Sequence, residues 1–168
     1  MQQAEFELNR QFGSFLVFLA LVVLMSAFGS QFGTGEWYAG LNKPAWNPPS
    51  WVFAPVWSTL YLLMSIAAWM VWNSGHEARN TAIAYWLAQL VLNGIWSWLF
   101  FGLHRPGWAL GDLALLIVVL VLTIRKFHAI RAPAAYLLLP YLAWVMFAWV
   151  LNLALWQMNG GGFGTILG

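Results

Sequence analysis

Five long apolar runs constrain the fold of this chain more than any other feature. A helix needs about 17–25 mostly apolar residues to cross a bilayer. Runs of this kind occupy residues 12–28, 51–72, 81–103, 108–124 and 133–158. Only 7% of the residues are charged, against about 25% in a soluble domain, so lipid is the expected solvent. We therefore predict an all-α membrane protein, with residues 1–168 forming one domain built as a five-transmembrane-helix bundle.

The connection between the first two runs, residues 29–50, is the only long one, and we name it the lid. Residues 37–64 hold four of the seven prolines and four of the thirteen tryptophans. Proline fixes the backbone φ angle, and consecutive prolines favour an extended path. The sequence therefore predicts an ordered lid that leads into the second helix. Long ordered loops in compact proteins are usually functional.

The basic residues predict how the bundle is oriented. With five spans, the N-terminus and the second and fourth connections share one side of the membrane. That side holds five basic residues and the other side two: Arg10, Arg79, Arg125, Lys126 and Arg131 against Lys43 and Arg105. In an inner membrane, the positive-inside rule places the N-terminus in the cytoplasm and the lid on the opposite face. The expected location is a bacterial cell envelope, and the sequence favours neither its inner nor its outer membrane.

Aromatic and polar residues recur every four positions in three of the runs, which places them on one face of each helix. These stripes are Trp57, Tyr61 and Ser65; Gln89, Asn93 and Ser97; and Pro140, Trp144, Ala148 and Asn152. Polar side chains in membrane helices face the bundle interior. The stripes thus predict either a cavity rich in aromatic surface or polar contacts between helices. Pro140 also predicts a kink, because it leaves the carbonyl of Tyr136 without a hydrogen-bond donor.

Several classes of function lack support in the sequence. The chain has no cysteine, and its formal net charge of +2 does not favour nucleic acid as a partner. The three histidines fall in predicted connections or at helix ends, so no metal site is expected. Asp112 is the only acid within a predicted span. We expect it in the first turn of the fourth helix, where the helix dipole stabilises a carboxylate.

Three segments carry a resemblance to a known family. Residues 37–64 read W-Y-x-x-L-x-K-P-x-W-x-P-P-x-W-x-F-x-P-V-W-x-x-L-Y-x-x-M. A-Q-L-V-L-N-G-I-W follows at Ala88–Trp96, and P-Y-L-A-W-V-M-F-A-W-V-L-N at Pro140–Asn152. This pattern strongly resembles the TspO/translocator protein family, also called tryptophan-rich sensory proteins or peripheral benzodiazepine receptors.

The resemblance implies a five-helix membrane bundle, usually a homodimer, that binds porphyrins such as protoporphyrin IX and haem, sterols, or benzodiazepine-type drugs. It places the pocket beneath the lid, among the second, third and fifth helices, and requires no cofactor. The sterol-recognition pattern of animal members is absent, because no Lys or Arg follows Tyr141. The resemblance and the stripes together give twelve expected ligand-binding residues: Tyr38, Trp46, Trp51, Phe53, Trp57, Tyr61, Gln89, Asn93, Trp144, Phe147, Ala148 and Asn152.

The expected function is a membrane-embedded sensor or carrier that binds a tetrapyrrole in an aromatic pocket under the lid. Two alternatives remain: a light-dependent porphyrin-degrading enzyme, in which Trp57 and Trp144 would be the catalytic residues, and a transporter of porphyrins, sterols or other lipophiles. Lys43 or Arg105 could pair with a porphyrin propionate, or extend toward lipid headgroups. Ala84 and Ala88 have the spacing of a helix-contact motif and are the expected dimer contact.

Overall fold

The computed structural model describes residues 2–161, in which every regular element is helical. Five of these helical segments are long and apolar enough to span a membrane. This confirms the predicted five-helix membrane bundle with a long ordered connection between its first two spans. The elements are α1 (Gln2–Ser30), α2 (Glu36–Gly40), η1 (Ser50–Val52), α3 (Phe53–Trp72), α4 (Arg79–Ser97), η2 (Trp98–Gly102), α5 (Pro106–Ile130), α6 (Ala132–Tyr136) and α7 (Leu139–Met158).

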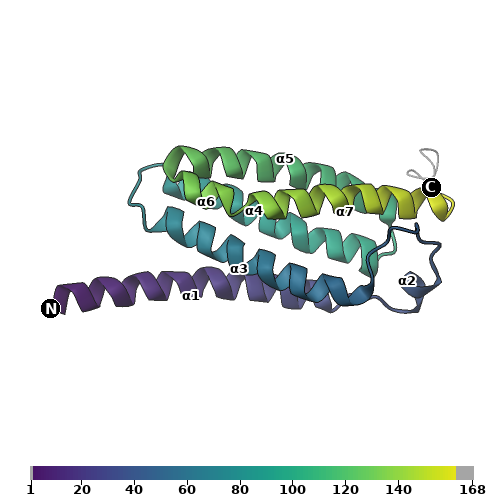
Figure 1. Cartoon of the computed structure of the whole chain (residues 1–168), viewed down its shortest axis with the longest axis horizontal. Helices are drawn as coiled ribbons and strands as arrows, with labels where there is room; N and C mark the ends of the chain where they lie inside the picture. Colours follow the sequence, from purple (N-terminus) through teal and green to yellow (C-terminus); the bar gives the residue numbers. More distant parts are fainter. Residues whose placement is uncertain (1, 162–168) are drawn as a thin grey trace.

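The helices pack side by side along one long axis (Figure 1). α1 lies against α3 and α4, and α5 lies between α4 and α7. In contrast, the backbones of α3 and α7 approach each other at few points, and ring contacts such as Phe53 with Trp144, centroids 5.9 Å apart, join the two helices. The N-terminus and the α3–α4 and α5–α6 connections lie at one end of the bundle, and α2, the lid and the end of α7 lie at the other (Figure 1).

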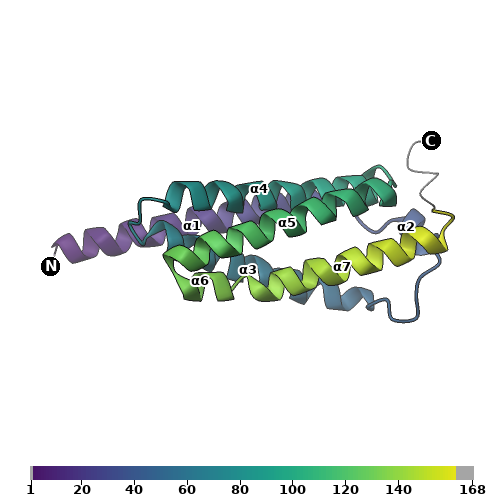
Figure 2. The ribbon, with the colours of Figure 1, turned by 90° about the horizontal axis from the view of Figure 1, so that it is seen from above.

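Several helices are longer than the sequence indicated. α1 begins at Gln2 and ends at Ser30, and its first turns project beyond the rest of the bundle (Figures 1 and 2). α5 runs from Pro106, whose fixed φ angle suits a first helical position, to Ile130. Because α5 begins at Pro106, Asp112 lies in its second turn. The expectation that Asp112 occupies the first turn was therefore wrong.

The fifth span is divided by Pro140. α6 ends at Tyr136, and α7 begins at Leu139 after a two-residue turn. Proline has no N–H to donate to the carbonyl four residues earlier, so a continuous helix would leave the Tyr136 carbonyl unpaired. Leu137 and Leu138 form a turn that keeps right-handed helical backbone angles, and the Leu142 N–H donates to the Leu138 carbonyl at 3.0 Å as α7 continues. The predicted distortion is thus a two-residue turn between α6 and α7.

The third span ends in a π-helix, which the sequence did not indicate. In η2 the Leu103 N–H donates to the carbonyl of Trp98, five residues earlier, at 2.8 Å. A π-helical turn widens the helix and is frequent at functional sites. Phe100 and Phe101 lie in this turn, and both rings pack edge-on against Tyr38 of the lid. η2 thus supplies aromatic surface beneath the lid.

Candidate functional site

Hydrogen bonds and ring contacts fasten the lid to the bundle. The Asn42 N–H donates to Oδ1 of Asn159, and Nδ2 of Asn159 donates to the Asn42 carbonyl, each at 2.9 Å. Trp37 stacks on the His104 imidazole, with ring centroids 4.3 Å apart. His104 has a positive φ of 55°, an uncommon conformation for a non-glycine residue, in the turn that joins η2 to α5. These contacts hold the first half of the lid across the ends of α4 and α7.

Replacing Asn159 with leucine is expected to release the first half of the lid. The amide of Asn42 would lose its acceptor, so its hydrogen exchange should accelerate by about tenfold, which corresponds to one hydrogen bond of about 1.4 kcal/mol. Exchange mass spectrometry of peptides covering residues 37–47 measures this change. Asn73→Leu is the matched control, because Asn73 bonds Ser14 at the opposite end of the bundle. Equal exchange of the lid in both variants would contradict a fastening role for Asn159.

A cavity of about 730 Å³ lies beneath the lid, and we name it the lid cavity. Its walls come from the end of α1, the lid, the start of α3 and the end of the third span. The residues that line it are Ser26, Gly29, Ser30, Phe32, Gly33, Thr34, Tyr38, Ala39, Lys43, Asn47, Pro48, Pro49, Ser50, Phe53, Ala54, Trp57, Tyr61, Trp96, Ser97 and Phe101. Its volume falls within the range of about 300–1,000 Å³ that is usual for small-molecule sites.

The roof of the lid cavity is a hydrogen-bonded part of the lid. Tyr38 donates its hydroxyl proton to Oδ1 of Asn47 at 3.3 Å, and Nδ2 of Asn47 donates to the Pro48 carbonyl at 3.0 Å. Burial raises the pKa of the Tyr38 phenol above its ordinary value, which keeps the phenol neutral and able to donate. Lys43 places its ammonium 4.7 Å from the centre of the Tyr38 ring. The roof therefore carries one cation over a neutral aromatic ring.

A smaller pocket of about 40 Å³, which we name the side pocket, shares part of its lining with the lid cavity and lies against α7. Tyr38, Phe53, Trp57, Trp96 and Phe101 line both spaces. The remaining residues that line the side pocket are Phe100, Trp144, Phe147, Ala148, Leu151, Asn152 and Leu155. Apart from Tyr38 and Asn152 these residues are apolar or are tryptophans, so the side pocket offers flat ring surface with few polar groups.

Two buried asparagines fix the helices around these spaces. Asn93 accepts a hydrogen bond from the Tyr61 hydroxyl at 3.4 Å and donates to the Tyr141 hydroxyl at 3.3 Å, which links α4 to α3 and α7. Asn152 accepts from the Trp96 indole N–H at 3.2 Å and donates to the Pro106 carbonyl at 2.8 Å. Both amides thus make the contacts between helices that the sequence allowed. Asn152 also lines the side pocket.

The structure gathers most of the expected ligand-binding residues beneath the lid. Four line the lid cavity, namely Tyr38, Phe53, Trp57 and Tyr61, and four more line the side pocket, namely Trp144, Phe147, Ala148 and Asn152. Trp46 packs edge-on against Phe147, with centroids 5.9 Å apart. Trp57 and Trp144, the residues implied for porphyrin degradation, both line the side pocket.

Four expected residues line neither space, and Trp46 is one of them. Trp51 is 74% exposed and lines neither the lid cavity nor the side pocket. Gln89 is fully buried, and its Nε2 donates to the Trp86 carbonyl at 2.8 Å. Asn93 is 5% exposed and acts behind the cavity wall through Tyr61. Of the polar stripe on the third span, only Ser97 reaches the lid cavity.

The sequence interpretation missed the wall that α1 contributes. Ser26, Gly29 and Ser30 of α1 line the lid cavity, whereas the expected pocket lay among the second, third and fifth spans. Ser26 and Ser30 are four residues apart, the same spacing that marked the other stripes, and this signal could have identified them. The contribution of Phe100 and Phe101 had no such signal, because adjacent residues of a regular α-helix point in different directions.

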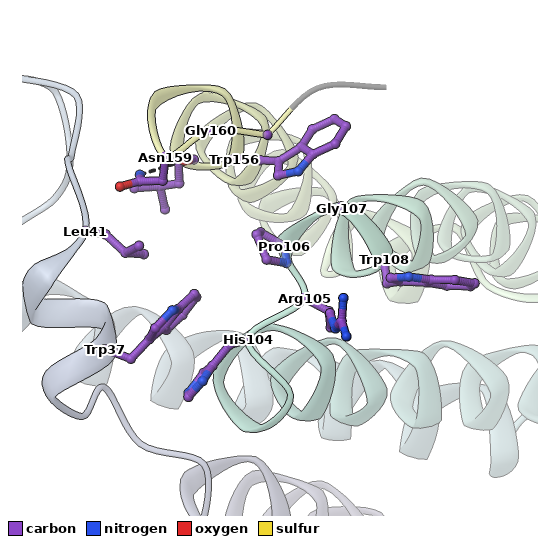
Figure 3. A pocket seen from close by; sticks show the side chains of 12 residues that line it. Trp37, Leu41, His104, Arg105, Pro106, Gly107, Trp108, Trp156, Asn159 and Gly160 are labelled. Atoms are coloured by element: carbon purple, nitrogen blue, oxygen red, sulfur yellow. Dashed lines mark hydrogen bonds between the residues drawn. The ribbon is translucent and has the colours of Figure 1, made fainter. Parts of the chain in front are cut away.

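A third cavity, of about 240 Å³, lies outside the lid where the ends of α4, α5 and α7 meet, and we name it the end pocket. Figure 3 shows Trp37 and His104 stacked on one side of it, Leu41 and Asn159 on another, and Arg105 on the side away from Leu41. Arg105 therefore borders the end pocket and does not line the lid cavity.

Comparison with known proteins shows which family this chain resembles in sequence. Residues 15–157 match the model of the TspO/MBR family. A protein of Bos taurus named Translocator protein is 43% identical over 148 residues, which cover 84% of this chain and 88% of that protein. The Tryptophan-rich protein TspO of Archaeoglobus fulgidus is 40% identical over 148 residues (86% and 96%). The Tryptophan-rich sensory protein of Cereibacter sphaeroides is 37% identical over 152 residues (90% and 95%).

Proposed function

Because this chain belongs to the TspO/MBR family, we propose that it is a membrane-embedded binding protein for tetrapyrroles such as protoporphyrin IX or haem, which acts as a sensor or carrier. One observation carries the proposal. The lid cavity and the side pocket together offer a space of tetrapyrrole size whose walls present several aromatic rings beneath an ordered lid. The names of the relatives, translocator and sensory protein, agree with a transporter or sensor class.

The arrangement of rings supports a flat ligand. Trp57 and Tyr61 lie next to each other on the α3 side, with centroids 5.1 Å apart, and Trp144 packs near Phe147 on α7 at 5.5 Å. Aromatic faces of this kind favour stacked or edge-on contact with another ring system. A macrocycle in the lid cavity would lie against Trp57 and Tyr61 of α3, next to the side pocket that Trp144 and Phe147 of α7 line. The lid would then exclude water from its upper edge.

Absorbance titration of the detergent-solubilised protein with protoporphyrin IX in the dark tests the proposal. We expect saturable binding, and we expect Trp57→Leu to weaken it by about tenfold, because loss of one aromatic contact costs about 1.4 kcal/mol. Trp108→Leu is the matched control, since Trp108 is 58% exposed and lies outside both spaces. Binding that does not saturate, or that both substitutions weaken equally, would overturn the proposal.

Illumination of the same samples separates the enzyme from the sensor or carrier. The second candidate is favoured by one observation: Trp57 and Trp144 border the same side pocket. In that case light would drive oxidation of the bound porphyrin and reduction of molecular oxygen, with the two indoles passing single electrons. Loss of the porphyrin bands under light, abolished in Trp144→Phe with dark binding intact, supports the enzyme. Stable bands under light support the sensor or carrier.

Membrane placement and assembly complete the proposal. The protein is an integral multi-pass membrane protein, and we place it in a bacterial cell envelope. If this is the inner membrane, the end with five basic residues faces the cytoplasm and the lid faces outward. Ala84 and Ala88 are exposed on α4, which supports the proposed homodimer contact there. Lipid covers the remaining apolar surface.

A further inference from the structure

A single charged side chain lines the lid cavity among the residues that the structure describes, and it is Lys43. Its Nζ donates to the Ala39 carbonyl at 3.1 Å and to the Leu41 carbonyl at 3.2 Å. The Tyr38 ring lies beneath the same nitrogen at 4.7 Å. These three neighbours hold the ammonium group in one place, whereas a surface lysine usually moves freely on its long side chain.

The coordination of Lys43 leaves a donor to spare. An ammonium group has three N–H donors, and the hydrogen bonds to the Ala39 and Leu41 carbonyls use two of them. No carboxylate lines the lid cavity within the described part of the chain. Lys43 is only partly buried, and an opposite charge stabilises a cation more strongly at a protein surface than in bulk water. The cavity is therefore matched to a ligand that brings its own anion.

We propose that Lys43 makes the lid cavity selective for ligands that carry a carboxylate, which accepts the remaining N–H of its ammonium group. This inference rests on the proposed tetrapyrrole function and adds to it the class of ligand: a flat apolar ring system with an acidic edge. The ring lies toward Trp57 and Phe53, and the acidic edge lies at the lid. Neutral lipophiles of the same size gain the ring contacts only.

The position of Arg105 excludes it from this role. Both Lys43 and Arg105 lie at the lid end of the bundle, and on sequence grounds either cation could pair with a propionate. Arg105 borders the end pocket beside Trp108, outside the lid cavity (Figure 3). A ligand beneath the lid therefore meets Lys43 alone, and one carboxylate per ligand is sufficient for recognition.

Binding of protoporphyrin IX and of its dimethyl ester, which masks both carboxylates, tests the inference. The wild-type protein, Lys43→Met and Lys43→Arg are titrated with both compounds in the same detergent. The quantity compared is the ratio of the two dissociation constants, because partition of each porphyrin into micelles then cancels between proteins. We expect Lys43→Met to lower the preference for the free acid by about tenfold, because a hydrogen bond to a charged group contributes about that factor. We expect Lys43→Arg to keep most of this preference.

The outcomes separate the inference from the function on which it rests. An unchanged ratio in Lys43→Met, with both porphyrins still bound, would overturn the inference and leave the proposed function intact. If Lys43→Met weakened the binding of both porphyrins equally, Lys43 would have a structural role in the lid, and the inference would also be overturned. Lack of saturable binding of either porphyrin to the wild-type protein would overturn the proposed function itself, and the inference with it.

Discussion

Replacement of Asn152 by leucine is expected to lower the thermal midpoint of the detergent-solubilised protein by about 4–8 °C, which corresponds to about 2 kcal/mol. Leucine has the same four branched side-chain heavy atoms as asparagine, but it is bulkier and neither accepts nor donates a hydrogen bond. The Trp96 indole N–H and the Pro106 carbonyl would lose the partners that they now have at 3.2 and 2.8 Å. Asn152 is 1% exposed, so water cannot replace its amide at low cost.

The matched control for this prediction is Asn80→Leu. Asn80 is exposed in the first turn of α4, and exposed substitutions usually change stability by less than about 0.5 kcal/mol. Both variants gain the same apolar side chain, so a difference between them isolates the buried hydrogen bonds. Thermal midpoints are measured by circular dichroism in one detergent. A shift for Asn152→Leu no larger than that of Asn80→Leu would contradict a bridging role for this amide.

Replacement of Gly94 by valine is expected to separate α1 from α4, and so to damage the fold and the lid cavity together. A Cβ atom at residue 94 would collide with Sδ of Met25 and lie 3.4 Å from Cδ1 of Phe28. Overpacking of this kind costs about 1–3 kcal/mol. Because Ser26 and Ser30 of α1 form one wall of the cavity, we expect a lower thermal midpoint and porphyrin binding weakened by about tenfold or more.

Two further variants sharpen this prediction. Gly111→Val makes the same change on the exposed face of α5, where a Cβ would have no neighbour within 4 Å, and it should leave binding unchanged. Gly94→Ala should fall between the wild type and Gly94→Val, since the flexible thioether of Met25 can move aside. If Gly94→Val binds porphyrin as tightly as Gly111→Val does, then the contact between α1 and α4 does not shape the cavity.

The length of the apolar runs and the low content of charged residues predicted the five-helix membrane bundle. The four-residue spacing within the runs identified Trp57 and Tyr61 on α3 and Trp144 and Ala148 on α7, which all border the spaces beneath the lid. It could not tell a cavity wall from a helix contact. The buried polar stripe therefore contained Gln89, which bonds only within its own helix in the described structure.

Departures from regular geometry were the part that spacing could not predict. The π-helix η2 rotates Phe100 and Phe101 relative to a continuous α-helix, and no residue pattern announced it. Pro140 predicted a distortion of the fifth span, but not that it would take the form of a two-residue turn between α6 and α7. Trp51 shows that the aromatic pattern also includes residues outside the site. It belongs to the pattern, but its side chain is exposed, and neighbouring residues form the cavity wall.

The ammonium group of Lys43 takes its position from the lid alone, because both carbonyls that hold it, and the ring beneath it, belong to residues 38–41. If the proposed carboxylate binds there, the charge that the ligand meets comes from one short segment of the lid, and the ring surface comes from the lid and the helices together. Substitutions within residues 38–43 would then alter the preference for ligand charge without changing the helices.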